Sequence, residues 1–184
     1  FEDGAFLVDL SPVDDPGLVI CALAHTLGLR HAGAKTLAAV VADYLADKDM
    51  LLVLDNFEQV MEAAAHVMHL LGRCPRVRVL VTSREALRIR GERVFAVPPL
   101  SLPERSARAS PQGVSQYEAV RLFVERAVAV RQDFAVDNDN APAVAEICAR
   151  LDGIPLAIEL AASRIRLLSP QAILARLQSR LQIG

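Results

Sequence analysis

The stretch from Met50 to Asp55 constrains the fold more than any other part of the chain. Five apolar residues follow one another without alternation and stop at Asp55. Such a run is typical of a strand in a parallel sheet that helices cover on both faces. Asp55 would then lie at the carboxyl end of the strand, where open α/β sheets place their ligand sites. A carboxylate there could bind the hydrated Mg²⁺ of a nucleotide, or it could simply help to cap the next helix.

Further strand-like segments before and after this run predict an α/β fold. We expect additional strands at Gly4–Leu10, Val77–Thr82 and Val94–Val97. Apolar residues at helical spacing predict helices between them: one from Pro16, one over 35–46, and one from an Asn56 cap to about Leu71. Strands separated by helices of this length predict a parallel sheet with right-handed crossovers.

The composition changes after the last expected strand. Residues 98–116 are rich in proline, serine, arginine and glycine, which predicts a linker. No strand pattern follows, and apolar spacing predicts four helices: 116–131, 142–151, 155–167 and one that begins at the Ser169-Pro170 cap. We therefore expect an α/β domain over 1–100, a linker over 101–116 and a small all-α subdomain over 117–184.

The composition also excludes several classes of protein. The chain has 184 residues, 53% of them hydrophobic, and a net charge of −2. No apolar run approaches the roughly 18 residues of a membrane span, and no secretory signal is visible, so we expect a cytoplasmic protein with no membrane partner. Cys21, Cys74 and Cys148 form no CxxC pair and are expected to be buried, reduced thiols. His66 and His69 share a predicted helix face, but no third metal ligand has suitable spacing.

The end of the third expected strand offers an arginine that could act together with Asp55. This strand ends in Thr82-Ser83-Arg84. If it neighbours the Asp55 strand, both ends open onto one crevice, and Arg84 comes near Asp55. An arginine beside a magnesium-binding carboxylate can bind a terminal phosphate through two hydrogen bonds. The alternative is a surface ion pair of Arg84 with Asp55 or Glu85.

A second notable segment is Gly153-Ile154-Pro155, within the helical part. Glycine ends one helix and proline opens the next, which fixes the angle between them. This segment could be a helix–helix corner and nothing more. It could also form a rigid apolar edge that packs against a planar base.

Three short motifs together resemble a known family. They are Val53-Leu54-Asp55-Asn56, then Thr82-Ser83-Arg84-Glu85, then Gly153-Ile154-Pro155-Leu156-Ala157. In this order and spacing they resemble the NB-ARC-like ATPase module of signal-transduction NTPases with numerous domains (STAND). More narrowly, the chain is similar to the version found in large bacterial transcriptional regulators of the LuxR and SARP kinds. The likeness covers essentially the whole chain.

The resemblance implies a fold, a ligand and residue roles. It implies a P-loop NTPase-type parallel sheet followed by a small helical subdomain, with ATP or ADP and Mg²⁺ bound. Asp55 would be the Walker B residue that binds Mg²⁺, Arg84 the sensor of the γ-phosphate and Pro155 the residue that packs on adenine, with Ser83 and Gly153 also at the nucleotide. The implied partners are flanking sensor and effector domains, a second copy through nucleotide-dependent self-association, and DNA only through a domain outside this chain.

The chain also departs from the family pattern. No GxxxxGK[ST] phosphate loop occurs in it, so we expect a fragment cut after that loop, which binds nucleotide weakly and does not hydrolyse it alone. The strand that carries the loop is central in the family, so the remaining strands would flank a vacancy or close over it. Asn56 stands where many ATPases place a second carboxylate. Hydrolysis in an intact parent should therefore be slow, as suits a switch, unless Glu58 substitutes.

Two other classes of protein compete with this interpretation. A response-regulator receiver would use Asp55 as phosphoacceptor and Thr82 as switch residue. It also needs an acidic pair at the first strand and a late lysine, whereas this chain offers only Asp9 and no lysine beyond Lys48. The second class is a non-catalytic protein-interaction scaffold with a degenerate NTPase fold. It stays open because the phosphate loop is absent from these residues.

Overall fold

The computed structural model describes residues 1–30, 34–104 and 110–181. The chain forms two compact units, Phe1–Phe95 and Ala96–Gly184. The first is an α/β unit with a three-stranded parallel sheet, as the Met50–Asp55 run predicts, and the described part of the second contains helices only. Each unit has its own hydrophobic core.

The sheet of the first unit contains β1 (Ala5–Asp9), β2 (Leu51–Asp55) and β3 (Arg78–Val81). All pairs are parallel, and the strand order is β1-β2-β3. The three strands are contiguous, so no vacancy lies between them, and a further strand could join only at an edge. The fourth expected strand, Val94–Val97, is wrong: these residues form no strand and are exposed.

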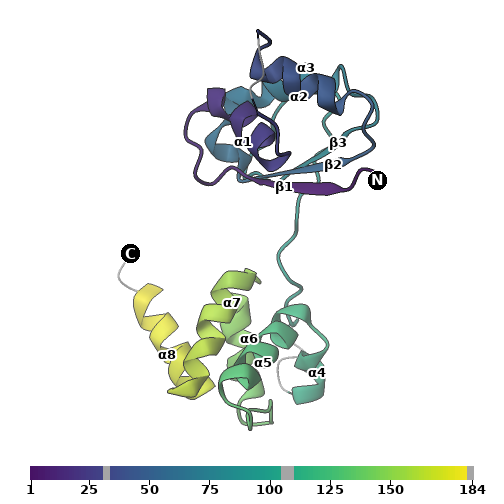
Figure 1. Cartoon of the computed structure of the whole chain (residues 1–184). Coiled ribbons are helices and arrows are strands. Elements are labelled where there is room, and N and C mark those ends of the chain that lie inside the picture. The colour runs from purple at the N-terminus through teal and green to yellow at the C-terminus, as the bar shows by residue number, and fades with distance from the viewer. Residues whose placement is uncertain (31–33, 105–109, 182–184) are drawn as a thin grey trace. The chain divides into compact units, whose positions relative to one another are not determined.

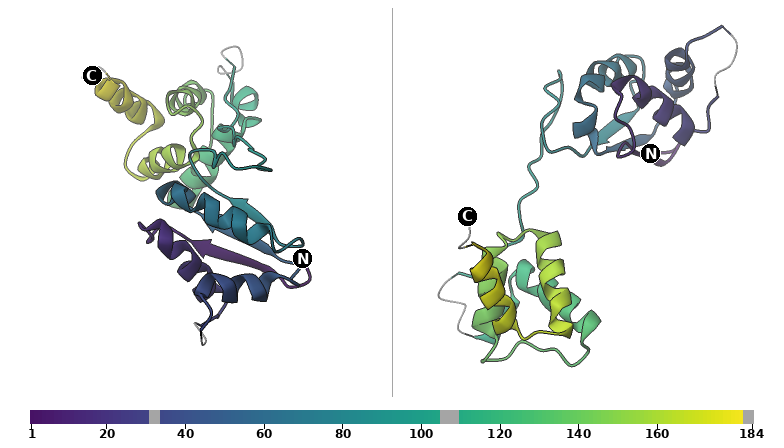
Figure 2. Two further views of the ribbon diagram at one scale, coloured as in Figure 1. Left: turned by 90° about the horizontal axis from the view of Figure 1, so that it is seen from above. Right: turned by 90° about the vertical axis from the view of Figure 1, so that its left-hand side faces the viewer.

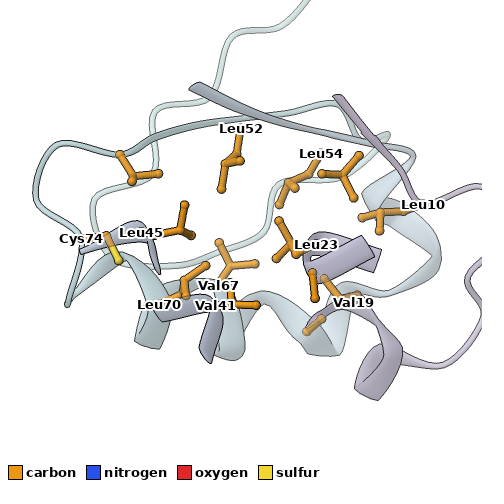
Figure 3. Packing of buried hydrophobic residues seen from close by; sticks show 14 of the residues in the cluster. Leu10, Val19, Leu23, Val41, Leu45, Leu52, Leu54, Val67, Leu70 and Cys74 are labelled. Atoms are coloured by element: carbon orange, nitrogen blue, oxygen red, sulfur yellow. The ribbon is translucent and has the colours of Figure 1, made fainter. Parts of the chain in front are cut away.

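Helices cover one side of this sheet (Figure 1). They are α1 (Val19–Thr26), α2 (Leu37–Leu45) and α3 (Ala64–Leu71). Figure 3 shows Leu52 and Leu54 of β2 facing the helices, among Leu23, Leu45 and Val67. Leu52 and Leu54 are each only 1% exposed, so the apolar run of β2 supplies the centre of this core on that side.

The segment after β2 differs from the expected continuous helix. Two short 3-10 turns, Phe57–Gln59 and Met61–Ala63, precede α3. Asn56 is not a side-chain cap, because its backbone is left-handed (φ 63°, ψ 42°) and its side chain makes no capping hydrogen bond. Asparagine tolerates this conformation better than most residues. It turns the chain sharply at the end of β2 and postpones the α-helix by two short turns.

The second unit is built from five helices and one 3-10 turn in its described residues (Figure 2). They are α4 (Pro111–Ser115), α5 (Glu118–Val130), α6 (Ala141–Arg150), α7 (Pro155–Ala162), the 3-10 turn Ser163–Arg166 and α8 (Pro170–Leu181). Val120, Phe123 and Ala127 of α5 are fully buried, as the apolar spacing predicts, whereas Val130, which the same spacing places inward, is 40% exposed. The Phe123 ring lies 6.1 Å from that of Phe134 (centroid to centroid).

The segment expected to be a linker contains structure of its own. Helix α4 lies within it, and Ser110 caps that helix by accepting a hydrogen bond from the Gly113 amide at 3.1 Å. Ser101 exchanges hydrogen bonds with Glu118, since each backbone amide donates to the other side chain at 3.1 Å. Residues 105–109 of the expected linker lie outside the described part. No described helix is long and apolar enough to cross a membrane.

The cysteines differ in accessibility. Cys74 and Cys148 are buried free thiols, as expected, whereas Cys21 is exposed on α1, contrary to expectation. Desolvation raises the pKa of the Cys74 thiol and raises that of Cys148 to about 12. Because the thiolate is the nucleophile, these two groups should react slowly for two reasons, burial and protonation.

Thiol labelling checks this difference. At pH 8, we expect a thiol-specific reagent to modify one cysteine per folded chain quickly and the other two only on unfolding. Cys21→Ser should abolish the fast phase, while Cys74→Ser should leave it unchanged. Fast labelling of two or three thiols in the folded chain would contradict the buried positions.

Candidate functional site

The carboxyl ends of the three strands lie at one edge of the sheet. Asp9 and Asp55 are register partners at the ends of β1 and β2, and Thr82 directly follows β3. In open parallel sheets this edge is where ligands bind. The structure therefore places Asp55 and the Thr82-Ser83-Arg84 segment on neighbouring strands, as the sequence predicted.

Hydrogen bonds hold the Asp55 carboxylate in place. The Thr82 hydroxyl donates to Oδ1 of Asp55. The same hydroxyl accepts a hydrogen bond from the Asn56 amide at 3.1 Å, and the Phe57 amide donates to the Thr82 carbonyl at 3.0 Å. The left-handed turn at Asn56 brings both amides over to β3. Among the described residues Oδ2 has no protein partner, so this half-buried carboxylate keeps one oxygen free for a cation.

Arg84 does not pair with Asp55 in the described structure. Its Nε donates to Oε1 of Glu58 at 3.0 Å. The Arg84 side chain is 84% exposed, against 16% for Glu58, and an ion pair this open to solvent contributes little to stability. The ion-pair partner of Arg84 is therefore Glu58, and neither Asp55 nor Glu85. The remaining guanidinium donors face water and could bind an anion.

The Ser83 side chain makes its contacts within the protein. Its hydroxyl accepts a hydrogen bond from the Glu85 amide at 3.2 Å and contacts the Met61 sulfur at 3.9 Å. The first contact closes a small turn after β3, which is a common use of serine in loops. Ser83 thus shapes the backbone from which Arg84 projects.

Gly153 and Pro155 lie in the second unit, at the corner between α6 and α7. Gly153 is buried with a φ of +68°, and a Cβ added there would lie 2.3 Å from the Leu100 carbonyl oxygen. The Leu100 amide donates to the Gly153 carbonyl at 2.9 Å. The corner therefore holds the backbone of Leu100 close to Gly153. The sequence did not predict this contact, which requires a glycine at position 153.

Pro155 opens α7 at an exposed apolar edge. It is the first residue of the helix, and its neighbours Ile154 and Leu156 are 52% and 66% exposed. The fixed φ of proline sets the start of the helix. This edge has the apolar character that packing on a planar base requires.

Sequence reasoning missed two partners in the first unit, Thr82 for Asp55 and Glu58 for Arg84. Both pairs join residues far apart in the chain, by 27 and 26 positions. One signal in the sequence could have indicated the first pair: a threonine directly follows one expected strand, and an aspartate ends the neighbouring one. The described residues contain no group of three or more His, Cys, Asp or Glu side chains that could bind a metal ion by themselves.

Comparisons with known proteins give mycobacterial relatives. No protein-family model matches the chain. Over 172 residues, 93% of the chain, it is 41% identical to a Mycobacterium tuberculosis protein named "Putative HTH-type transcriptional regulator", and the match covers 18% of that protein. A Mycobacterium bovis protein with the same description matches to the same extent. Over all 184 residues it is 41% identical to an uncharacterized M. tuberculosis protein, of which it covers 44%. The chain thus spans less than half the length of these relatives.

Proposed function

We propose that this chain is the nucleotide-responsive part of a transcriptional regulator and that, within a longer parent, it binds ATP or ADP with Mg²⁺. The observation that carries the proposal is Asp55. Its carboxylate lies at the end of the central strand, where Thr82 binds one oxygen and no other described residue binds the second. The names of the mycobacterial relatives support the regulatory context.

In this proposal each predicted site residue has a role. Asp55 binds Mg²⁺ through water or through the nucleotide, since oxygen ligands suit this ion. Arg84 exchanges its weak pair with Glu58 for the γ-phosphate, which offers a stronger charge-assisted contact. Ser83 positions the turn from which Arg84 projects. Gly153 fixes the turn before α7, and Pro155 with its neighbours presents the apolar edge that packs on adenine.

The parent would act as a switch and only slowly as an ATPase. Asn56 cannot accept a proton, and its backbone is committed to the turn after β2. The described chain contains no phosphate loop of the GxxxxGK[ST] type, so residues 1–184 alone should bind nucleotide weakly and not hydrolyse it. An NB-ARC-like, LuxR-type P-loop module would be completed by sequence outside these residues.

The proposed partners follow from the same context. Flanking sensor and effector domains of the same polypeptide would respond to ADP or ATP, with self-association as one response. DNA would be bound by another domain, and the protein would act in the cytoplasm with no membrane partner.

A second candidate function is a non-catalytic interaction scaffold. The ion pair of Arg84 with Glu58 favours the scaffold, because the arginine expected to bind phosphate already binds a carboxylate of the protein. Nucleotide binding by the parent separates the two candidates.

Arg84→Ala in the parent tests the switch. With Mg²⁺ present we expect ATP affinity to fall about tenfold, which corresponds to roughly 1.4 kcal/mol, and ADP affinity to stay unchanged, because only ATP carries the γ-phosphate. Arg90→Ala, an exposed arginine of the same segment, is the matched control and should change neither. Isothermal titration measures both affinities. A parent that binds neither nucleotide would support the scaffold instead. A variant that loses affinity for both nucleotides equally would contradict the role of Arg84 at the γ-phosphate.

A further inference from the structure

Hydrogen bonds between two backbone segments bring Glu58 to the candidate site. The Phe57 amide donates to the Thr82 carbonyl at 3.0 Å, and the Asn56 amide donates to the Thr82 hydroxyl at 3.1 Å. Phe57 is fully buried in the core, which fixes the 3-10 turn that contains Glu58. Glu58 follows Phe57 directly, and Arg84 lies two residues after Thr82. The hydrogen bonds therefore hold the backbones of both charged residues at the same end of the sheet.

The two side chains of the Glu58–Arg84 ion pair differ in exposure. Nε of Arg84 donates to Oε1 of Glu58 at 3.0 Å, and the Glu58 side chain is 16% exposed against 84% for Arg84. A carboxylate that its surroundings largely cover keeps its position, whereas a long side chain open to water changes rotamer within nanoseconds. Arg84 is therefore the partner that can turn to another anion, and Glu58 is the fixed one.

The Glu58 carboxylate and a γ-phosphate compete for one guanidinium group. Arginine binds carboxylate and phosphate oxygens alike, through charge-assisted hydrogen bonds. ADP has no γ-phosphate, so it leaves the ion pair as it is. ATP must either displace Glu58 from Arg84 or bind beside a carboxylate that repels its terminal charge. In both cases the free-energy cost that Glu58 imposes falls on ATP and not on ADP.

The ion pair is not needed to hold the α/β unit together. Pairs between side chains this open to solvent change an equilibrium constant by about fivefold or less. The Thr82 hydrogen bonds and the burial of Phe57 fix the same two segments without any charge. Removing the Glu58 carboxylate should therefore leave the fold intact and change only what Arg84 binds.

We propose that Glu58 sets the preference of this site between ADP and ATP, by holding Arg84 until a γ-phosphate displaces it. Glu58 acts through Arg84, so it is a specificity-determining residue that need not touch the nucleotide. The inference rests on the proposed function, because it requires that the parent binds nucleotide. With ADP, or with no nucleotide, the ion pair is formed; with ATP, Arg84 leaves it. The strength of the pair therefore shifts the balance between the two states.

A double-mutant cycle in the parent tests this role, with Mg²⁺ present and both affinities measured by isothermal titration. Glu58→Gln keeps the size of the side chain and removes its charge. We expect it to raise ATP affinity about three- to fivefold, the scale of an exposed ion pair, and to leave ADP affinity unchanged. In a parent that already carries Arg84→Ala, Glu58→Gln should change either affinity by less than about twofold, because no guanidinium remains to be released.

Glu62→Gln is the matched control. Glu62 is an exposed acid of the next 3-10 turn, and its substitution should change either affinity by less than about twofold. Unchanged ADP affinity in Glu58→Gln also shows that this variant is folded.

The outcomes separate this inference from the proposed function. An unchanged ratio of ATP affinity to ADP affinity in Glu58→Gln would overturn the inference, although nucleotide binding itself would stand. A gain in ATP affinity that persists beside Arg84→Ala would also overturn it, since general charge repulsion would then explain the gain. So would loss of both affinities in Glu58→Gln, because Glu58 would then be required for the site to form. A parent that binds neither nucleotide would overturn the proposed function and this inference together.

Discussion

Gly153→Ala is expected to destabilise the helical unit by about 2–4 kcal/mol. Two costs add. Alanine is disfavoured at a φ of +68°, and its Cβ would overlap the Leu100 carbonyl oxygen, which lies 2.3 Å from the position it must occupy. The backbone atom cannot move aside freely, because the Leu100 amide is bonded to the Gly153 carbonyl at 2.9 Å. Either the turn between α6 and α7 opens or the contact with Leu100 is lost.

Denaturant unfolding followed by hydrogen exchange of peptides from α6 and α7 measures this effect, since the chain has no tryptophan. Gly72→Ala is the control. Gly72 is right-handed (φ −60°), and its added Cβ would meet backbone atoms only at an ordinary 3.6 Å. That variant should be neutral or slightly stabilised. If Gly153→Ala were as stable as Gly72→Ala, the close contact of Leu100 with Gly153 would not exist as described.

Asp55→Asn in the parent is expected to lower the affinity for Mg·ATP at least tenfold. The amide oxygen can still accept the Thr82 hydroxyl hydrogen bond, so the strand ends should stay joined. The lost negative charge removes a magnesium ligand, because Mg²⁺ binds carboxylate oxygen in preference to neutral amide groups. In EDTA the variant and the wild type should bind ATP alike.

Asp9→Asn is the matched control for this experiment. Asp9 is the register partner of Asp55 at the same sheet edge, and its Oδ1 accepts the Ser11 amide hydrogen bond at 2.8 Å. Hydrogen bonds from the Ser11 side chain and the Ser11 amide lower the pKa of the Asp9 carboxyl, so the substitution removes a negative charge at pH 7. Equal losses at the two positions would indicate a general effect of charge at this edge. No loss at Asp55 would remove it from the metal site.

The α/β architecture was predictable because it depends on local signals. The β2 strand and its buried residues follow from an uninterrupted apolar run that stops at a charged residue. Helices α5 and α8 follow from apolar spacing, and α8 begins at its expected Pro170. The expected strand at Val94–Val97 was wrong although its residues favour strands, because a strand also needs a neighbour to pair with. The described structure gives these residues none.

The candidate site was predictable only in part. A parallel sheet brings the ends of neighbouring strands together, so the adjacency of Asp55 and the segment after β3 followed from the strand order. Which side chains bond could not be foreseen. The left-handed turn at Asn56 shifts Glu58 toward Arg84 and brings two amides to Thr82, and such a turn has no clear sequence signature in a residue that also caps helices well.

Residue order alone determined that this chain has a parallel sheet built on Met50–Asp55, then helices joined by a glycine–proline corner. Periodicity and turn residues act over a few positions and need no tertiary context. Only the tertiary structure decided that Thr82 holds Asp55, that Glu58 engages Arg84, and that Leu100 requires a glycine at 153. These contacts depend on which strands become neighbours and on how the chain turns at the end of each element.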